Sequence, residues 1–269
     1  MVPLDGSEFS TRAIPAAAAI GRASASDVHI VGVARDADQI ASLDNLIHQA
    51  LRLNSIAANS DLDVIIGRDP ASALLRLAND PSNLVCLSSH GHSKAVATIM
   101  NSVGSHLIDR AVQPLLVVGT NFDDTMLAAD VVVALDGVSD PEQLLATGAG
   151  IALKLKAPLR IVTVYEPALP DLRRPTHYSR SHGPSSDPEI YLEKMRRRAT
   201  ELGLTAVTTA AIADPVSVVA GLAVHLEHRP ALMLVAGGRR RTGLGLTPGV
   251  IGGLLGLVSL PVLVVNRRP

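Results

Sequence analysis

The sequence contains no tryptophan, and aromatic residues of all kinds supply only 2% of its 269 residues. Proteins that bind unpaired bases stack them on aromatic side chains, and nucleic-acid-binding domains carry an excess of basic residues. Here 24 Lys and Arg residues face 25 Asp and Glu residues, so that the net charge is -1. The scarcity of aromatic side chains and the balanced charge therefore exclude nucleic acid as an expected partner.

Only one cysteine is present, Cys86, so the chain has neither an internal disulfide nor a metal site made of several cysteines. It lies in an apolar run, residues 84–87. A cysteine in such a run predicts a small buried side chain rather than a reactive thiol. No metal site is expected from this residue.

Two segments bear on whether the protein enters a membrane. Asp5 and Glu8 stand where a signal peptide would have an apolar stretch. Residues 243–266 carry no charge and are long enough to span a bilayer, but Pro248 and Pro261 interrupt them. Residues 261–265 read instead as a buried β-strand. We therefore expect a cytoplasmic protein that does not enter a membrane.

Four short motifs of the first half of the chain recur in the second half, which indicates a tandem repeat. Paired in order, they are residues 4–6 with 135–137, 29–33 with 160–164, 69–70 with 214–215, and 114–118 with 261–265. The offset grows in the middle, where a stretch rich in Pro, Ser, His and Arg predicts an inserted loop at about 166–190. We expect domain 1 at 1–120, a linker at 121–129 and domain 2 at 130–269.

Each half alternates short β-branched runs with longer segments of helical spacing, a pattern typical of βαβ units around a parallel sheet. In the first half it predicts strands near 2–4, 28–34, 62–66, 84–88 and 115–118. We expect Ser7 to cap the first helix, Pro15 to kink it, and Asp140 with Pro141 to begin the matching helix of the second half. The predicted fold is α/β, with two tandem five-stranded, mainly parallel sheets and helices on both faces.

Parallel sheets of this kind bind ligands at the carboxyl ends of their strands, because helix N-termini and tight turns there present backbone N–H groups to anions. Three segments of the first half are expected at these ends: residues 3–7, 33–35 and 88–91. Ser102 follows Gly91 by eleven residues and is expected to open the last helix. A candidate ligand site therefore lies on these segments.

The same segments resemble, over nearly the whole chain and twice, the signatures of universal stress proteins. One signature corresponds to residues 2–7, and the other begins at residues 89–91, passes residues 101–103 and ends in the strand at 114–118. The resemblance implies an adenine nucleotide alpha hydrolase-like fold whose halves pair through their last strands. In members that bind ATP, the second signature is Gly, two residues, Gly, nine residues, Gly and then Ser or Thr, and its backbone holds the phosphates.

Carried onto the first half, this signature has Ser88 and Asn101 in two of its three glycine positions. Asn tolerates a left-handed backbone and Ser is small, and both keep their N–H donors. The resemblance thus implies ATP, with Mg²⁺ only together with the nucleotide. It assigns the base and ribose to Pro3, Leu4, Asp5 and Val33, and the phosphate loop to Ser88, Gly91, Asn101, Ser102 and Val103.

The second half keeps Asp136 in place of Asp5 but departs further in the loop, where Val235 and Pro248 stand in glycine positions. A β-branched side chain disfavours positive φ, and proline removes a donor N–H and fixes φ. The final hydroxyl residue is replaced by Gly249. A shift of register or a hydroxyl from Thr247 would not restore the pattern, so we expect no nucleotide in this half.

Several of these residues also have simpler interpretations. Asp5 can end a strand and accept a hydrogen bond from its own turn. His90 has no evident carboxylate to orient it, and a Gly-x-Ser-x-Gly motif is absent, so a catalytic role is not expected. The arginines at 239–241 can hold phosphate or lie in a solvated loop. The insert rich in His and Arg shows no spacing typical of metal ligands.

The resemblance implies a nucleotide-responsive binding module that acts in stress adaptation through an unknown protein partner. The alternative is an interaction or structural protein that has lost nucleotide binding in both halves, which the altered loops favour. An enzyme is not expected, because a Walker-type lysine loop, paired carboxylates for Mg²⁺ and a base are lacking. We also expect a two-fold homodimer, the commonest soluble assembly.

Overall fold

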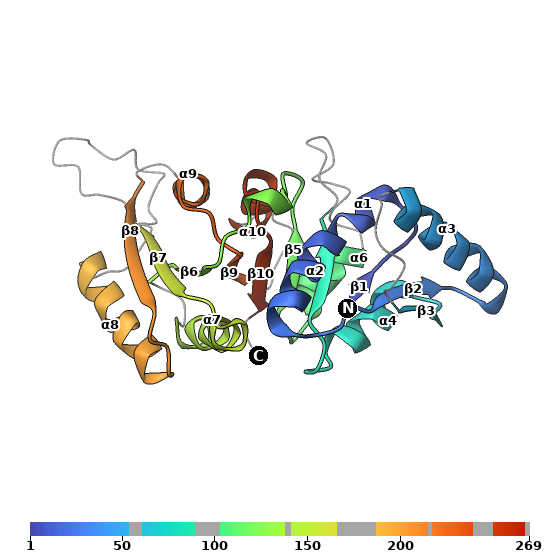
Figure 1. Ribbon diagram of the computed structural model, residues 1–269, viewed down its shortest axis with the longest axis horizontal. Helices are drawn as coiled ribbons and strands as arrows, with labels where there is room; N and C mark the ends of the chain where they lie inside the picture. The colour runs from blue at the N-terminus through green and yellow to red at the C-terminus, as the bar shows by residue number, and fades with distance from the viewer. Residues whose placement is uncertain are drawn as a thin grey trace, which may run out of the picture. The chain divides into compact units, whose positions relative to one another are not determined.

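The computed structural model describes residues 1–53, 61–89, 103–137, 141–165, 187–214, 217–238 and 250–266. The chain forms two compact units (Figure 1). Unit 1 comprises residues 1–125 and 238–269, and unit 2 comprises residues 126–237. The end of the chain therefore belongs to the same unit as its beginning.

Unit 1 is built on five parallel strands. They are β1 (Val2–Pro3), β2 (Ile30–Ala34), β3 (Leu62–Ile66), β4 (Val85–Ser88) and β5 (Leu115–Val118). Ladders join β1 to β2, β2 to β3 and β4 to β5. Strand β1 has only two residues, but the residue before it joins it to β4. Met1 N donates to Leu84 O at 3.0 Å, and Cys86 N donates to Met1 O at 2.9 Å. The strands thus follow the order β3-β2-β1-β4-β5, and all five predicted strands are confirmed.

Helices cover both faces of this sheet, with α2 and α3 on one face and α4 and α6 on the other (Figure 1). The helices of unit 1 are α1 (Glu8–Thr11), α2 (Ala13–Ser24), α3 (Ile40–Leu53), α4 (Pro70–Ala78), α6 (Val103–Arg110) and α10 (Val250–Leu257), with short 3-10 turns η1 (Ala37–Gln39) and η2 (Asp124–Met126). Ser7 caps α1 as predicted, since its side chain accepts from Ser10 N. The helix is interrupted at Arg12, between α1 and α2, because Pro15 has no N–H to donate to the carbonyl of the residue four positions earlier.

The last strand of the chain, β10 (Val262–Asn266), pairs antiparallel with β5. Val262 lies opposite Val117 and Leu263 opposite Leu116, and residues 262–264 are fully buried. Asn266 ends the strand by donating from Nδ2 to the carbonyls of Ile108 at 2.6 Å and Ala111 at 3.0 Å. The predicted pairing between the last strands of the two repeats is therefore confirmed.

Unit 2 has four parallel strands in the order β9-β6-β7-β8. They are β6 (Val131–Leu135), β7 (Leu159–Tyr165), β8 (Val207–Ala213) and β9 (Met233–Gly238). Helices α7 (Pro141–Leu155) and α8 (Pro188–Glu201) lie on one face and α9 (Val218–His228) on the other (Figure 1). The predicted α/β class, with parallel sheets covered by helices, is confirmed.

Three sequence expectations fall partly outside the described residues. Of the expected insert, residues 166–186 are not described, and α8 begins at Pro188. Asp140, the expected cap of α7, is also not described, although the helix begins at Pro141 as predicted. In the uncharged stretch 243–266 the described part forms α10 and β10, and no helix in the described ranges is both long and apolar enough to cross a membrane.

Unit 2 buries one arginine, Arg160, at the start of β7, where only 1% of its surface is exposed. Its guanidinium donates to Asp130 Oδ2 at 2.9 Å and to the carbonyls of Arg229 at 2.8 Å and Pro230 at 2.9 Å. These bonds tie the entry to β6, the start of β7 and the end of α9 together. Arg160 holds the place in the second repeat that His29 holds in the first, where the imidazole is half-exposed.

Candidate functional site

The candidate site of unit 1 lies where β1 and β4 end side by side. The two hydrogen bonds of Met1 with residues 84 and 86 place Met1 opposite Val85. Counting forward along both strands brings Leu4 opposite Ser88 and Asp5 beside Ser89. The order β3-β2-β1-β4-β5 reverses its direction between β1 and β4, and this switch point is the usual ligand position in such sheets.

The Asp5–Gly6 turn that leaves β1 is tightly built. Asp5 Oδ1 accepts from Ser7 N at 2.9 Å and from Ser7 Oγ at 2.6 Å. Gly6 has φ +82°, and a Cβ there would lie 2.8 Å from Leu46 Cβ. Only glycine fits this backbone and this space. The interpretation that Asp5 stabilises its own turn is therefore confirmed, and one carboxylate oxygen serves that purpose.

At the end of β4, two adjacent serines differ in their bonding. Ser89 donates to Val118 O from both N, at 2.8 Å, and Oγ, at 3.1 Å. The Ser88 hydroxyl is buried but has no hydrogen-bond partner within the described part of the chain. A buried hydroxyl without a partner is rare because its desolvation is not compensated. Ser88 therefore marks the end of β4 as a place where a polar ligand atom would be stabilised.

The other predicted site residues lie around this point or outside the described residues. Pro3 ends β1, Val33 is half-buried in β2, and Val103 begins α6. Gly91, Asn101 and Ser102 lie outside the described ranges, as does His90. The structure thus brings Leu4, Asp5 and Ser88 together, and the assignment of the phosphate loop stays a prediction.

The corresponding turn of unit 2, Asp136–Gly137, has the same backbone but a different neighbour. Gly137 has φ +67°, as expected for the equivalent of Gly6. The hydroxyl of Tyr191, on α8, is buried beside this turn without a well-formed hydrogen bond to a described residue. Burial and the charge of Asp136 raise the pKa of Tyr191 to about 12, and the Gly137 N–H opposes the shift.

Sequence reasoning missed Tyr191. The available signal was its rarity, because the whole chain has only three tyrosines. The buried phenol of Tyr191 thus occupies space beside the Asp136–Gly137 turn. The two repeats therefore differ at the first strand as well as in the later loop.

The position predicted for Val235 in the second repeat is wrong. Val235 was expected in a turn that needs positive φ, but it lies within β9 and is fully buried. In the described ranges, the residues other than glycine with positive φ are Ala25 and Lys156. Val132 lies opposite Leu234, so the residue opposite Leu135, the last residue of β6, is Gly237 and not Val235. A β-branched residue suits an extended strand, and Val235 therefore does not distort the loop. Pro248 lies outside the described residues.

Comparisons with known proteins give the family and the fold of the chain. The model of the universal stress protein family matches residues 129–266, just over half of the chain. The chain belongs to the universal stress protein family. Residues 1–128 lie outside the matched range. No curated protein matches the sequence.

Solved structures of universal stress proteins share the fold. One from Archaeoglobus fulgidus is 17% identical, covers 99% of this chain and 95% of its own, and has a TM-score of 0.68. A putative one from Pseudomonas aeruginosa is 16% identical, covers 98% and 91%, and has a TM-score of 0.57. A universal stress protein in complex with cAMP is 22% identical over 51% of this chain and 98% of its own, with a TM-score of 0.40. The two longer matches confirm the predicted fold.

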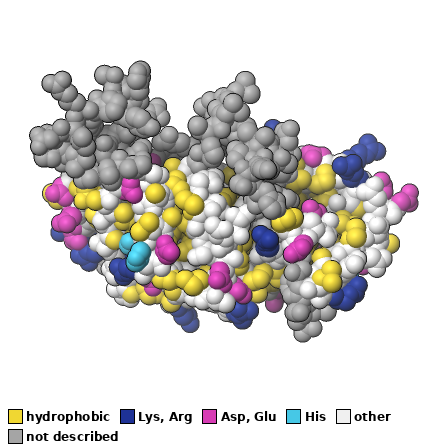
Figure 2. Space-filling view, turned by 90° about the horizontal axis from the view of Figure 1, so that it is seen from above, with side chains coloured by type: hydrophobic (Ala, Val, Ile, Leu, Met, Phe, Trp, Pro, Cys, Tyr) yellow, Lys and Arg dark blue, Asp and Glu magenta, His cyan; other side chains and the backbone are white. Residues whose placement is uncertain are grey.

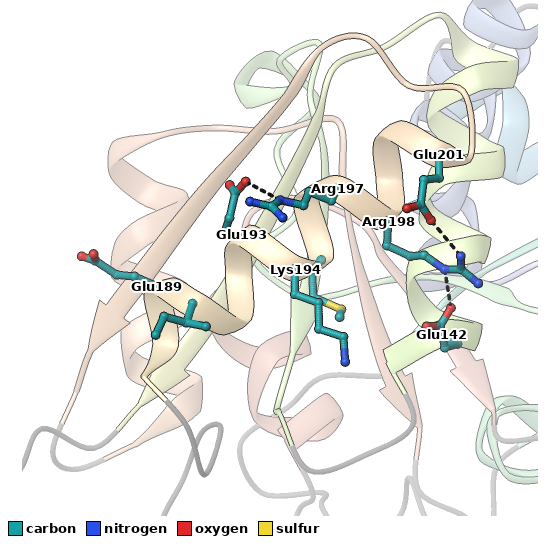
Figure 3. A pocket seen from close by; sticks show the side chains of 9 residues that line it. Glu142, Glu189, Glu193, Lys194, Arg197, Arg198 and Glu201 are labelled. Atoms are coloured by element: carbon teal, nitrogen blue, oxygen red, sulfur yellow. Dashed lines mark hydrogen bonds and ion pairs between the residues drawn. The ribbon is translucent and has the colours of Figure 1, made fainter.

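A groove of about 860 Å³ lies on unit 2 (Figure 3). It runs along α8 and is bordered by Glu142 of α7. Its charged groups pair with one another: Arg198 contacts Glu142 at 3.2 Å and Glu201 at 2.8 Å, and Arg197 contacts Glu193 at 3.0 Å. We assign no ligand to this groove, because both of its arginines are already paired with neighbouring carboxylates.

The charges on the described surface are of mixed sign. On the face shown in Figure 2, side chains of both signs are interspersed among apolar and neutral atoms, without a broad patch of one sign among the residues drawn in colour. Within the described ranges, no group of three or more His, Cys, Asp or Glu side chains could hold a metal ion.

Proposed function

We propose that the protein is a tandem universal stress protein that binds one adenine nucleotide, most simply ATP, in its first repeat. Mg²⁺ would enter only with the nucleotide. The protein would act as a binding module in stress adaptation, inside the cytoplasm and without catalysis. The observation that carries the proposal is the buried Ser88 hydroxyl without a partner, at the strand end beside Asp5.

Two features support the tandem arrangement. In both repeats the first strand ends in Asp-Gly, and both glycines have positive φ. In unit 1 the strands follow the order β3-β2-β1-β4-β5 and are all parallel. The four parallel strands of unit 2, in the order β8-β7-β6-β9, correspond to the first four of these. The first repeat therefore has the strands that the family fold requires, although the family model matches only the second.

The residues at the switch point offer suitable chemistry for a nucleotide. A carboxylate at Asp5 can accept hydrogen bonds from ribose hydroxyls, and the Ser88 hydroxyl can donate to or accept from a polar ligand atom. Half-buried Val33 offers an apolar contact to the base. Helix α6 begins at Val103, and the N–H groups of a helix N-terminus favour phosphate.

The second repeat is proposed to stay empty. Tyr191 lies against the Asp136–Gly137 turn, and its burial there leaves less room for a ribose. Pro248 supplies no N–H at a position where the family loop donates one. We therefore expect one nucleotide per chain.

The second candidate function is a protein that acts through its surfaces and binds no nucleotide. This second function is favoured because Asp5 Oδ1 already accepts two hydrogen bonds from Ser7 within its own turn. Heat denaturation of the purified protein, followed by chromatography of the released material, distinguishes the two functions. Adenine nucleotide in the supernatant supports the proposal.

A variant at the site sharpens this test. Ser88→Ala should abolish copurification and weaken binding of added ATP at least about tenfold, because it removes the hydroxyl without adding volume to the site. Ser26→Ala, on an exposed loop, is the matched control and should bind as the wild type does. Absence of nucleotide from both the purified protein and equilibrium dialysis with ATP would favour the second candidate.

A further inference from the structure

Strand β8 is an edge strand of unit 2. It runs over seven residues, Val207–Ala213, and pairs with β7 on one side. No strand among the described residues pairs with its other side. An edge of this kind presents a row of backbone N–H and C=O groups that another strand can pair with.

The hydrogen bonds at its two ends show which residues face outward. Leu159 N donates to Ala206 O at 2.9 Å, and Asp214 N donates to Tyr165 O at 3.0 Å. Because the direction of the backbone groups alternates along a strand, the even-numbered residues of β8 bond to β7. The N–H and C=O groups that point away from β7 are those of Val207, Thr209, Ala211 and Ala213.

Natural edge strands usually carry a charge, a proline or a bulge that prevents pairing with other chains. β8 carries none of these in its seven residues. The equivalent edge of unit 1, β3, contains the exposed Asp63. Ile30 and Ile161 are equivalent in the two repeats, and they lie opposite Leu62 and Thr209 respectively. The next residues of the two edge strands, Asp63 and Ala210, are therefore equivalent as well. The two repeats therefore differ in edge protection at one position.

A shallow groove of about 380 Å³ lies along the carboxyl-terminal half of β8. Residues 211–214 form one wall and one face of α9 forms the other, with Gly221, Val224, His225 and His228. Val224 is 54% exposed. An added strand would thus find apolar surface beside the hydrogen-bonding edge.

We propose that β8 pairs antiparallel with β8 of a second copy of this chain, with the two-fold axis at Ala210. This register places Thr209 opposite Ala211 and Val207 opposite Ala213, so that every outward residue meets an outward residue. No like charges meet, because the seven residues are uncharged. The chain already pairs equivalent strands in this manner, since β5 and β10 are antiparallel. The inference is independent of nucleotide binding.

Light scattering coupled to size-exclusion chromatography over a wide range of concentrations tests the proposal. The wild type should have twice the monomer mass of 28.0 kDa when concentrated and dissociate on dilution. Ala211→Pro removes an outward N–H while the β7 ladder is kept, so its dissociation constant should rise at least about tenfold. The control is Val64→Pro in β3, where bonds of Asp61 O and Gly67 N to β2 show that Val64 also faces outward. It should dimerise as the wild type does.

A charge exchange tests the register and remains decisive if the proline variant does not fold. Ala210→Asp and Ala210→Lys each place like charges opposite each other in the dimer, so each alone should be monomeric at concentrations where the wild type is dimeric. An equal mixture of the two should dimerise again. A wild type with a mass of 28.0 kDa at every concentration, or charged variants that dimerise as well as the wild type, would overturn the proposal.

Discussion

Leu116 of β5 lies directly opposite Leu263 of β10, and the two leucines occupy the same place in the two sequence repeats. Val117 opposite Val262 and Leu115 opposite Val264 complete a pair of strands with a local two-fold axis. Each strand thereby covers an apolar edge that would otherwise be open. The tandem repeat thus provides, within one chain, a symmetric contact of the kind that separate copies form in dimers.

This pairing makes the core of unit 1 sensitive to either leucine. Leu116→Ala and Leu263→Ala should each lower the free energy of unfolding by about 2–5 kcal/mol, because both side chains are at most 1% exposed. Leu257→Ala on α10 is the control, since Leu257 is 55% exposed and its loss should cost less than about 0.5 kcal/mol. Urea unfolding followed by circular dichroism measures all three. Equal, small effects at all three positions would contradict the arrangement of β5 and β10.

Unit 2 should depend on its buried arginine. Arg160→Ala leaves Asp130 and two backbone carbonyls without their donor, so we expect a loss of roughly 3–5 kcal/mol in unfolding free energy. The matched control is His29→Ala, because His29 holds the same place in the first repeat but is half-exposed and 4.0 Å from Asp61. Its loss should cost less than about 1 kcal/mol. Urea titrations that rank His29 above Arg160 would show that this account of unit 2 is wrong.

Cys86 should be unreactive in the folded protein. Its side chain is 2% exposed, its Sγ lies 3.4 Å from Ala13 O, and burial raises the pKa of the thiol to about 12. Because the thiolate is the reactive form, a disulfide reagent at neutral pH should label Cys86 only as fast as the protein unfolds. Labelling followed spectrophotometrically, with and without urea, measures this. Rapid modification of the folded protein would contradict the position of β4 between β1 and β5.

The sequence predicted the strands well because each is a short apolar run bounded by polar or turn residues. Val85–Ser88 and Leu115–Val118 were found within one residue of their predicted places. Ser7 and Pro15 marked the start and the break of the first helices, since capping and the missing N–H of proline act locally. The resemblance to universal stress proteins then predicted the pairing of β5 with β10.

What the sequence could not predict depends on register and on side chains from distant segments. Val235 was placed in a turn because spacing alone was compared, whereas the ladder of β9 with β6 continues past it. Helix α8 brings Tyr191 to the Asp136 turn, and β7 brings Arg160 to Asp130. Neither contact can be predicted from the position of these residues in the sequence. The spacing of motifs therefore located the site at the strand ends but not the neighbours that distinguish the two repeats.

The central claim is that the first repeat alone binds an adenine nucleotide, and isothermal titration calorimetry with ATP and Mg²⁺ tests it most directly. We predict one nucleotide per chain, with binding abolished by Asp5→Ala and Gly91→Val. Asp136→Ala should change the affinity by less than about twofold. Circular dichroism of each variant checks that the fold is kept. A stoichiometry of two per chain, or equal losses from Asp5→Ala and Asp136→Ala, would contradict the claim.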